Sequence, residues 1–340
     1  MDLAIAWFVI IAILWTGYLV LEGFDFGVGM LVRIAGRGDR ERRLAINTIG
    51  PVWDGNEVWL ITAAGATFAA FPEWYATLFS GFYLPLVLIL LALIVRAVSI
   101  EYRGKINSAS WRNRWDWSIV ATGWLPSFLL GVVFANLIRG VPIDGSGEFT
   151  GSLQDLLSPF ALVGGLVTLS LFLSHGAIFL ALKTDGAVRE RSESIASIAS
   201  SVTVAVAGAW IVWAQVAYST AWTWAVVAAA AASLVAARLL IGAGRFGWAF
   251  VANAAVIASF VALAFGSMYP DVLPSTTDPA FSLTVQSASS TDYTLGIMTW
   301  VAGFLTPVVL AYQGWTYWVF RRRLRVEDLP AHREPTFAGT

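Results

Sequence analysis

Long apolar stretches, rather than alternating apolar and polar positions, dominate the pattern of this chain. Six stretches carry no Asp, Glu, Lys or Arg over about the 20 residues that a helix needs to cross a bilayer. They cover residues 3–21, 74–95, 117–138, 156–182, 246–270 and 293–320. Each is predicted to form one transmembrane helix.

Two further segments complete the pattern. Residues 194–237 are uncharged throughout, which is too long for one crossing, and the polar pair Ser219 and Thr220 indicates a turn between two helices. Residues 44–72 form another apolar stretch, interrupted by Asp54 and Glu57. The pattern therefore predicts an all-α integral membrane protein of about nine transmembrane helices. Predicted helices 1–4 and 5–8 could form two four-helix bundles, with the ninth helix outside them.

The basic residues predict how these helices are oriented. With the N-terminus outside, the loops after predicted helices 1, 3, 5 and 7 and the C-terminal tail hold 19 of the 21 Lys and Arg residues. The predicted outer loops hold only Arg139. Short cytoplasmic loops are enriched in Lys and Arg, so this distribution supports the assignment. We expect residues 1–320 to form a multi-pass transmembrane domain, and residues 321–340 to form a basic and polar cytoplasmic tail.

Composition narrows the possible functions. Charged residues make up 13% of the chain, about half the share in a soluble domain, and the net charge of -1 gives no sign of nucleic-acid binding. The absence of cysteine excludes disulfides and thiolate metal sites. The two histidines are His175 and His332, and heme irons usually take axial ligands of the His, Met or Cys type. We therefore expect this chain alone to hold no metal and no heme.

Ionisable residues inside predicted membrane helices are the candidates for chemistry, because burying each in a bilayer costs free energy. Asp54 and Glu57 are three residues apart, which places them on one side of a helix. At 1.5 Å per residue they lie about 27 and 22 Å inward from the outer end of their helix. Arg96 lies at the inner end of the next helix, and Glu22 and Asp25 are expected to close the inner end of the first.

Acids near the cytoplasmic side of a membrane suit the uptake of protons from the cytoplasm. Two other interpretations remain open from the residues alone. An acid could form a structural ion pair with Arg96, or it could simply face the lipid headgroups. Asp54 and Glu57 favour a functional role, because they interrupt an otherwise apolar helix.

Several motifs resemble subunit II of cytochrome bd-type quinol oxidases. Residues 17–29 contain the sequence Glu-Gly-Phe-Asp-Phe-Gly, and residues 50–60 read Gly-Pro-Val-Trp-Asp-Gly-Asn-Glu-Val-Trp-Leu. Residues 71–75, Arg96 and residues 101–103 fit the same family. The resemblance covers the whole chain in helix number, and residues 15–105 in motif detail.

The resemblance implies a complex of the bacterial plasma membrane that oxidises quinol, reduces O2 to water and generates a proton gradient. Subunit I of that family holds two b-type hemes and one d-type heme, and subunit II is its heme-free partner; small accessory subunits can attach. Carried over to this sequence, Asp54, with Glu57 and Asp25, marks a cytoplasmic proton path. Trp53, Arg96 and Asp25 mark a site where a quinone binds.

Two rival functions stay open at this point. A secondary transporter would use the buried acids and Arg96 as an ion-coupling site, although such sites usually lie near the membrane midplane on broken helices. A pure assembly scaffold would use the same acids only for structure. A d-type heme absorption band that co-purifies with the chain would decide between oxidase and transporter.

Overall fold

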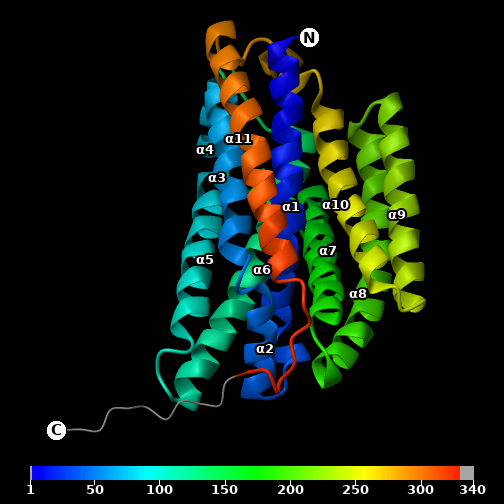
Figure 1. The fold of residues 1–340 in the computed structure, drawn as a ribbon. Coiled ribbons are helices and arrows are strands. Elements are labelled where there is room, and N and C mark those ends of the chain that lie inside the picture. Colours follow the sequence, from blue (N-terminus) through cyan, green and yellow to red (C-terminus); the bar gives the residue numbers. More distant parts are fainter. Residues whose placement is uncertain (1, 330–340) are drawn as a thin grey trace, which may run out of the picture.

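The computed structural model describes residues 2–329 of the 340-residue chain, and this part is built almost entirely of helices (Figure 1). The α-helices are α1 (Leu3–Ala35), α2 (Asp39–Ile49), α3 (Trp53–Ala70), α4 (Pro72–Gly81), α5 (Tyr83–Tyr102), α6 (Ala109–Arg139), α7 (Pro159–Lys183), α8 (Gly186–Tyr218), α9 (Trp224–Gly242), α10 (Phe246–Met268) and α11 (Asp292–Val319). Two single-turn 3-10 helices, η1 (Ala221–Thr223) and η2 (Pro279–Phe281), and two short strands, β1 (Asp271–Leu273) and β2 (Leu283–Thr284), lie in the connections.

The predicted all-α membrane fold is confirmed, and the count of nine crossings is approximate. Among the described residues, eight helices are long and apolar enough to span a bilayer, namely α1, α5, α6, α7, α8, α9 with η1, α10 and α11. The remaining predicted helix is α3, whose 18 residues include Asp54 and Glu57. The start of α1 and the segment that follows α11 lie at opposite ends of the molecule (Figure 1), which fits an odd number of crossings.

Several predicted boundaries change in the structure. The predicted helix 74–95 is divided between α4 and α5, which meet at Phe82. The long uncharged segment does form two helices, α8 and α9, as predicted. Gln215 stabilises their turn, since its side chain donates to the Thr220 carbonyl at 2.8 Å and accepts from the Thr223 hydroxyl at 2.8 Å.

The packing of the helices matches two four-helix bundles with one helix outside them. Helices α1, α3, α5 and α6 pack together, as do α7, α8, α9 and α10, and α7 packs on α1 and α6. Glycines allow this close contact: a Cβ atom on Gly27 of α1 would lie 2.7 Å from the Gly176 Cα of α7. The last helix, α11, lies beside α1 and α3 and buries only 6% of its apolar span (Figure 1).

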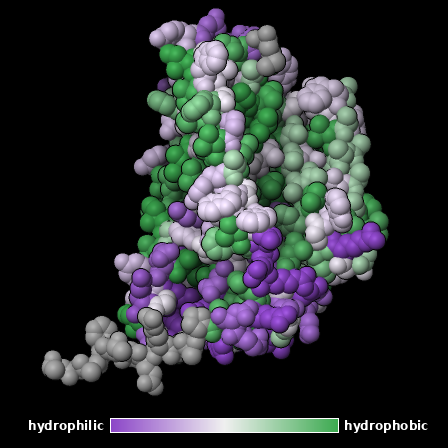
Figure 2. All heavy atoms as spheres, in the orientation of Figure 1, coloured by the Kyte–Doolittle hydropathy of each residue, from purple (hydrophilic) through white to green (hydrophobic). Residues whose placement is uncertain are grey.

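Polar residues gather at one end of the molecule. Figure 2 shows a hydrophobic middle and a hydrophilic lower end, where α2 and the segment after α11 lie. This end carries the basic loops of the sequence, so it is the predicted cytoplasmic side. The opposite end is closed by the segments 140–158 and 269–291, which are joined by the bridge between Val141 and Ser275. In this outer region, hydrogen bonds from the hydroxyl and amide of Ser146 hold the pKa of Asp144 below its ordinary value.

The first part of the predicted tail is docked against the helices. We call residues 320–329 the C-terminal strap. Lys183 donates to the carbonyls of Phe320 and Arg322, and the Leu324 amide donates to the Lys183 carbonyl at 2.8 Å. Leu329 is buried in the lower core. Residues 330–340 of the predicted tail, with His332, lie outside the described residues.

Candidate functional site: a buried cluster of charged residues

Glu22 and Asp25 lie inside α1 rather than at its end. The expectation that they close the inner end of the first helix is wrong, because α1 continues to Ala35 and buries both side chains completely. Phe24, Phe26 and Val28 carry the apolar pattern past the two acids. Polar and charged side chains of α3 and α5 offset the free-energy cost of burying these two acids.

Arg96 joins two of the acids. Its guanidinium, 1% exposed, forms ion pairs with Glu22 of α1 and, at 2.6 Å, with Glu57 of α3. It also lies over the ring of Phe26, 4.6 Å from the ring centroid, in a cation–π contact. A buried charge is stable only when it is paired, and here one cation from α5 serves carboxylates of two other helices. The cluster therefore ties α1, α3 and α5 together.

Asp25 is held by a different set of polar groups. The Asn56 side chain donates from Nδ2 to Asp25 Oδ2 at 2.7 Å. Asn56 Oδ1 accepts from the Tyr317 hydroxyl at 2.8 Å and from Gln313 Nε2 at 3.3 Å, both on α11. Gln313 Oε1 in turn accepts from Trp59 Nε1 at 3.0 Å. These contacts extend the charged cluster to the last helix of the chain.

Asp54 lies apart from this cluster. It is exposed in the first turn of α3 and forms no hydrogen bond or ion pair with another described side chain. Arg96 is paired with Glu22 and Glu57 instead, so the structural ion pair considered for Asp54 is not the arrangement seen here. Asp54 shares its outer stripe of α3 with exposed apolar residues, among them Val58 and Ile61.

The three residues assigned to a quinone site come together only in part. Trp53 is 8% exposed and belongs to the lower core with Phe24 and Val28. Asp25 Oδ1 and Arg96 Nε and Nη1 are buried without a hydrogen-bond partner among the described residues. The two cavities at the cytoplasmic end are lined by other residues, including Glu41 and Arg325 in one and Lys183 in the other. The quinone site stays a prediction.

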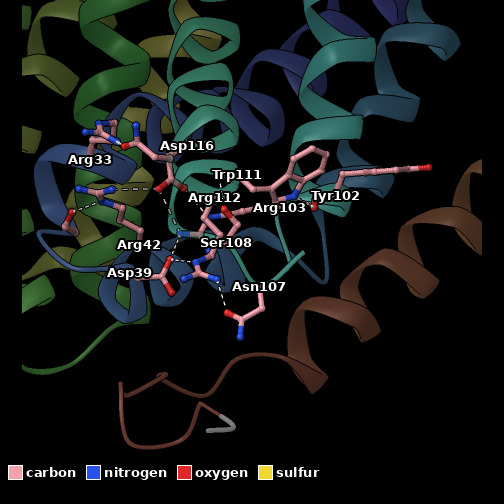
Figure 3. Close-up of polar contacts among 12 residues, drawn as sticks. Arg33, Asp39, Arg42, Tyr102, Arg103, Asn107, Ser108, Trp111, Arg112 and Asp116 are labelled. Atoms are coloured by element: carbon pink, nitrogen blue, oxygen red, sulfur yellow. Dashed lines mark hydrogen bonds and ion pairs between the residues drawn. The ribbon is translucent and has the colours of Figure 1, made fainter. Parts of the chain in front are cut away.

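A second charged cluster at the cytoplasmic end was not found from the sequence. Asp116 of α6 is fully buried and accepts from Arg103 Nε at 2.5 Å and from Arg42 at 3.2 Å (Figure 3). Asp39 pairs with Arg103 and Arg112. Arg103 directly follows α5, about two helical turns after Arg96, so this cluster fixes the end of the helix that carries Arg96. The one signal in the sequence was an acid directly before the predicted helix 117–138.

His175 is the histidine to consider as a heme ligand among the described residues. His175, the histidine of the membrane region, is fully buried, with Nε2 3.2 Å from the Val20 carbonyl. Its ring stacks on Phe250 at a centroid distance of 4.2 Å, and Nδ1 is buried without a hydrogen-bond partner among the described residues. The described residues also contain no group of three His, Cys, Asp or Glu side chains placed to bind a metal ion. That the chain holds no heme stays a prediction.

Comparison with known proteins identifies the family. Residues 3–320 match the family described as cytochrome bd terminal oxidase subunit II. The chain belongs to this family. The match spans almost all of the described helices and includes the buried cluster.

Curated relatives extend the assignment to nearly the full chain of this bd oxidase subunit II. Cytochrome bd ubiquinol oxidase subunit 2 of Bacillus subtilis is 40% identical over 336 residues, covering 97% of each chain. Cytochrome bd-I ubiquinol oxidase subunit 2 of Escherichia coli is 37% identical over 361 residues, covering 95% of each. A chain of the bd oxidase structure from Geobacillus thermodenitrificans has the same fold, with a TM-score of 0.75 at 20% identity and coverage of 94% and 99%. Subunit II of a bacterial bd oxidase is a multi-pass membrane protein of a terminal oxidase complex, and a secondary transporter is not favoured.

Proposed function

We propose that this chain is the heme-free half of a complex that oxidises quinol, reduces O2 to water and generates a proton gradient. Subunit I, as partner, would hold two b-type hemes and one d-type heme. This chain would supply scaffold and a path for protons from the cytoplasm. The observation that supports the path is the buried cluster of Glu22, Asp25, Glu57 and Arg96.

The charges of this cluster favour proton storage. Three carboxyl groups surround one guanidinium, so a fully ionised cluster would have a net charge of about -2 inside the protein. Unit charges at 4 Å interact with about 4 kcal/mol even at an effective dielectric constant of 20. Protons on the carboxyl groups relieve this repulsion, and Arg96 stays charged. The cluster is thus suited to take up and release protons while the helices stay in place.

Asp54 supplies the connection to the cytoplasmic end of the path. It lies in the first turn of α3, one turn before Glu57, whose side chain is 20% exposed and pairs with Arg96. Protons enter near Asp54 and are held by Glu57 and the buried acids before passing to subunit I. Each transfer is between a positioned carboxyl group and its neighbour, which is ordinary acid–base chemistry.

The face formed by α3, α5 and α11 is suited to bind subunit I. Large apolar side chains cover it, including Ile61 (72% exposed), Ile94 (60%), Trp300 (84%) and Phe304 (75%). Asp54 is on the same stripe of α3 as Ile61, and an unpaired carboxylate against lipid is unfavourable. A protein partner on this face would shield Asp54 from lipid. Small accessory subunits would bind elsewhere.

A quinone bound near Trp53, Arg96 and Asp25 is a second candidate role. The free Nε and Nη1 donors of Arg96 support it, because a quinone carbonyl accepts hydrogen bonds. Extraction of lipid from the purified complex, followed by chromatographic identification of quinones, tests this role. A lower ratio of quinone to heme in the Arg96→Met complex that still assembles would support it, and a wild-type complex without quinone would contradict it.

Purification of the native complex through an affinity tag on this chain tests the main proposal. We expect an absorption spectrum with b-type and d-type heme bands, and quinol-dependent consumption of O2 that stays with the complex. A tagged chain that purifies without d-type heme, from membranes that contain it, would contradict the proposal. A tag on an unrelated membrane protein from the same cells is the control.

A further inference from the structure

Asn56 connects the proton-carrying acid Asp25 to the last helix. Its side chain is fully buried on α3 and makes hydrogen bonds at both ends. Nδ2 donates to Asp25 Oδ2, and Oδ1 accepts from two residues of α11. The two ends of an amide differ in chemistry, because oxygen only accepts and nitrogen only donates. The orientation of the Asn56 amide therefore decides whether Asp25 faces a hydrogen-bond donor or an acceptor.

Trp59 determines this direction. An indole N–H can only donate, so the end of Gln313 that lies 3.0 Å from Trp59 Nε1 must be its oxygen. Gln313 then presents its Nε2 donor to Asn56, at 3.3 Å. The end of Asn56 that meets this donor must be its oxygen, which leaves Nδ2 for Asp25. The orientations of both amides thus follow from the fact that the Trp59 indole can only donate.

A fixed donor at Oδ2 has a consequence for the proton of Asp25. A proton on Oδ2 would oppose the Asn56 N–H, whereas Oδ1 is buried and has no hydrogen-bond partner among the described residues. Rotation of the Asn56 amide would break the bonds to Gln313 and Tyr317 and leave buried donors unsatisfied, at about 1–3 kcal/mol each. The charged groups around Asp25 are Glu22 on its own helix, Glu57 on α3 and Arg96 on α5.

We propose that Asn56 is a positioning residue: the chain from Trp59 through Gln313 holds its amide as a permanent donor to Asp25 Oδ2, so that Oδ1 is the oxygen that takes up and releases the proton. The arrangement is complete only when α11 is seated on α3, because Gln313 belongs to α11. This inference rests on the proposed role of Asp25 in proton uptake.

Infrared difference spectroscopy of the purified complex, between high and low pH, tests the proposal. The carboxylic acid C=O band that is lost in Asp25→Asn is assigned to Asp25. With a proton on Oδ1, the C=O oxygen is Oδ2, and the hydrogen bond from Asn56 lowers its stretching frequency. Asn56→Ala should therefore shift the Asp25 band to higher wavenumber. Trp59→Phe should split or shift the band, because Gln313 and Asn56 can then rotate.

Trp248→Phe is the matched control, since Trp248 lies on α10 and is 67% exposed. Its Asp25 band should stay at the wild-type position. An Asp25 band that does not move in Asn56→Ala and Trp59→Phe complexes of normal heme content would overturn the proposal. So would the absence of any Asp25-dependent acid band at low pH, because Asp25 would then carry no proton.

The same experiment separates this inference from the proposed proton path. Full turnover of O2 in Asp25→Asn, with a band in the wild type that responds to Asn56, would retain the positioning role and remove Asp25 from the path. Loss of turnover in Asp25→Asn, with a band that ignores both Asn56 and Trp59, would retain the path and overturn the positioning role.

Discussion

At the scale of single residues, Arg96 is the cation on which the buried acids depend. Arg96→Met should leave Glu22 and Glu57 without a positive charge in the protein interior. Removing one partner of a buried ion pair typically costs about 3–5 kcal/mol, so we expect a steep fall in the amount of intact complex. Heme content per milligram of membrane protein measures it. Arg139→Met, in the outer region, is the control and should assemble normally.

Asp54 gives the sharpest test of the proton path. Asp54→Asn keeps the size of the side chain and removes its titratable group. Turnover of O2 with quinol should fall by about 10²-fold, the usual effect of losing a positioned proton donor, while heme content stays normal because Asp54 makes no ion pair. Oxygen-electrode turnover per d-type heme is the measurement. Asp278→Asn, in the exposed outer segment, is the control, and wild-type turnover in Asp54→Asn would remove Asp54 from the path.

Sequence reasoning found the charged members of the site and missed the neutral ones. Glu57 and Arg96 are detectable because a charge inside an apolar stretch is rare. Asn56 is fully buried, but an amide in a membrane helix is ordinary, and its role depends on Gln313 far along the chain. The same holds for Asp116, whose two partners, Arg42 and Arg103, come from separate segments of the chain. Which acids are joined to Arg96 was likewise decided by helix packing, which the sequence does not show.

At the scale of elements, helix contacts decide what substitutions the chain tolerates. Gly27 of α1 faces Gly176 of α7, and an added Cβ on Gly176 would lie 2.5 Å from the Gly27 Cα. Gly176→Ala should therefore push the two bundles apart. We expect a loss of about 1–3 kcal/mol or more, typical of overpacking, and a lower melting temperature of the detergent-solubilised complex by size-exclusion chromatography.

Gly208→Ala is the control for this substitution, because a Cβ there has no neighbour within 4 Å. Its melting temperature should equal or slightly exceed that of the wild type, since alanine favours a helix more than glycine does. A Gly176→Ala complex as stable as Gly208→Ala would contradict the close packing of α1 and α7.

The number and type of helices were largely predictable, and their ends were not. Hydropathy located each crossing because apolar length is a local property. It ended the first helix too early, at residue 21, because Glu22 and Asp25 look like a membrane boundary unless their partners are known. It also placed one helix across Phe82, where the structure has a break between α4 and α5. Tertiary contacts thus overrode the local pattern at both positions.

At the scale of the whole molecule, the distribution of basic residues predicts the orientation in the membrane. A reporter that is active only in the cytoplasm should be active when fused after Arg43, Lys105 or Arg325. The same reporter inserted between residues 275 and 290 should be silent, because that segment lies at the opposite end of the molecule (Figure 1). Colony assays with matched expression levels measure this. Activity in the outer segment would contradict the orientation.

The chain without its partner should be colourless. Its membrane histidine is already engaged by Val20 and Phe250. Expression of this chain alone, followed by purification in mild detergent and a pyridine hemochrome assay, should find no stoichiometric heme. It should also yield less folded protein than co-expression with subunit I, because the apolar face of α3, α5 and α11 would be uncovered. Stoichiometric heme on the folded chain would contradict this, and His175→Ala would then test the ligand.

The position of α11 has a consequence for how the protein is made. A ribosome synthesises α11 and the C-terminal strap after the other described helices. Gln313 and Tyr317 are therefore the last of the Asn56 partners to be synthesised. The carbonyls of residues 320 and 322, to which Lys183 donates, are synthesised after them. A chain released before this point would contain all of the buried acids and lack the groups that orient Asp25. The arrival of α11 is thus also the step that completes the polar contacts around Asp25.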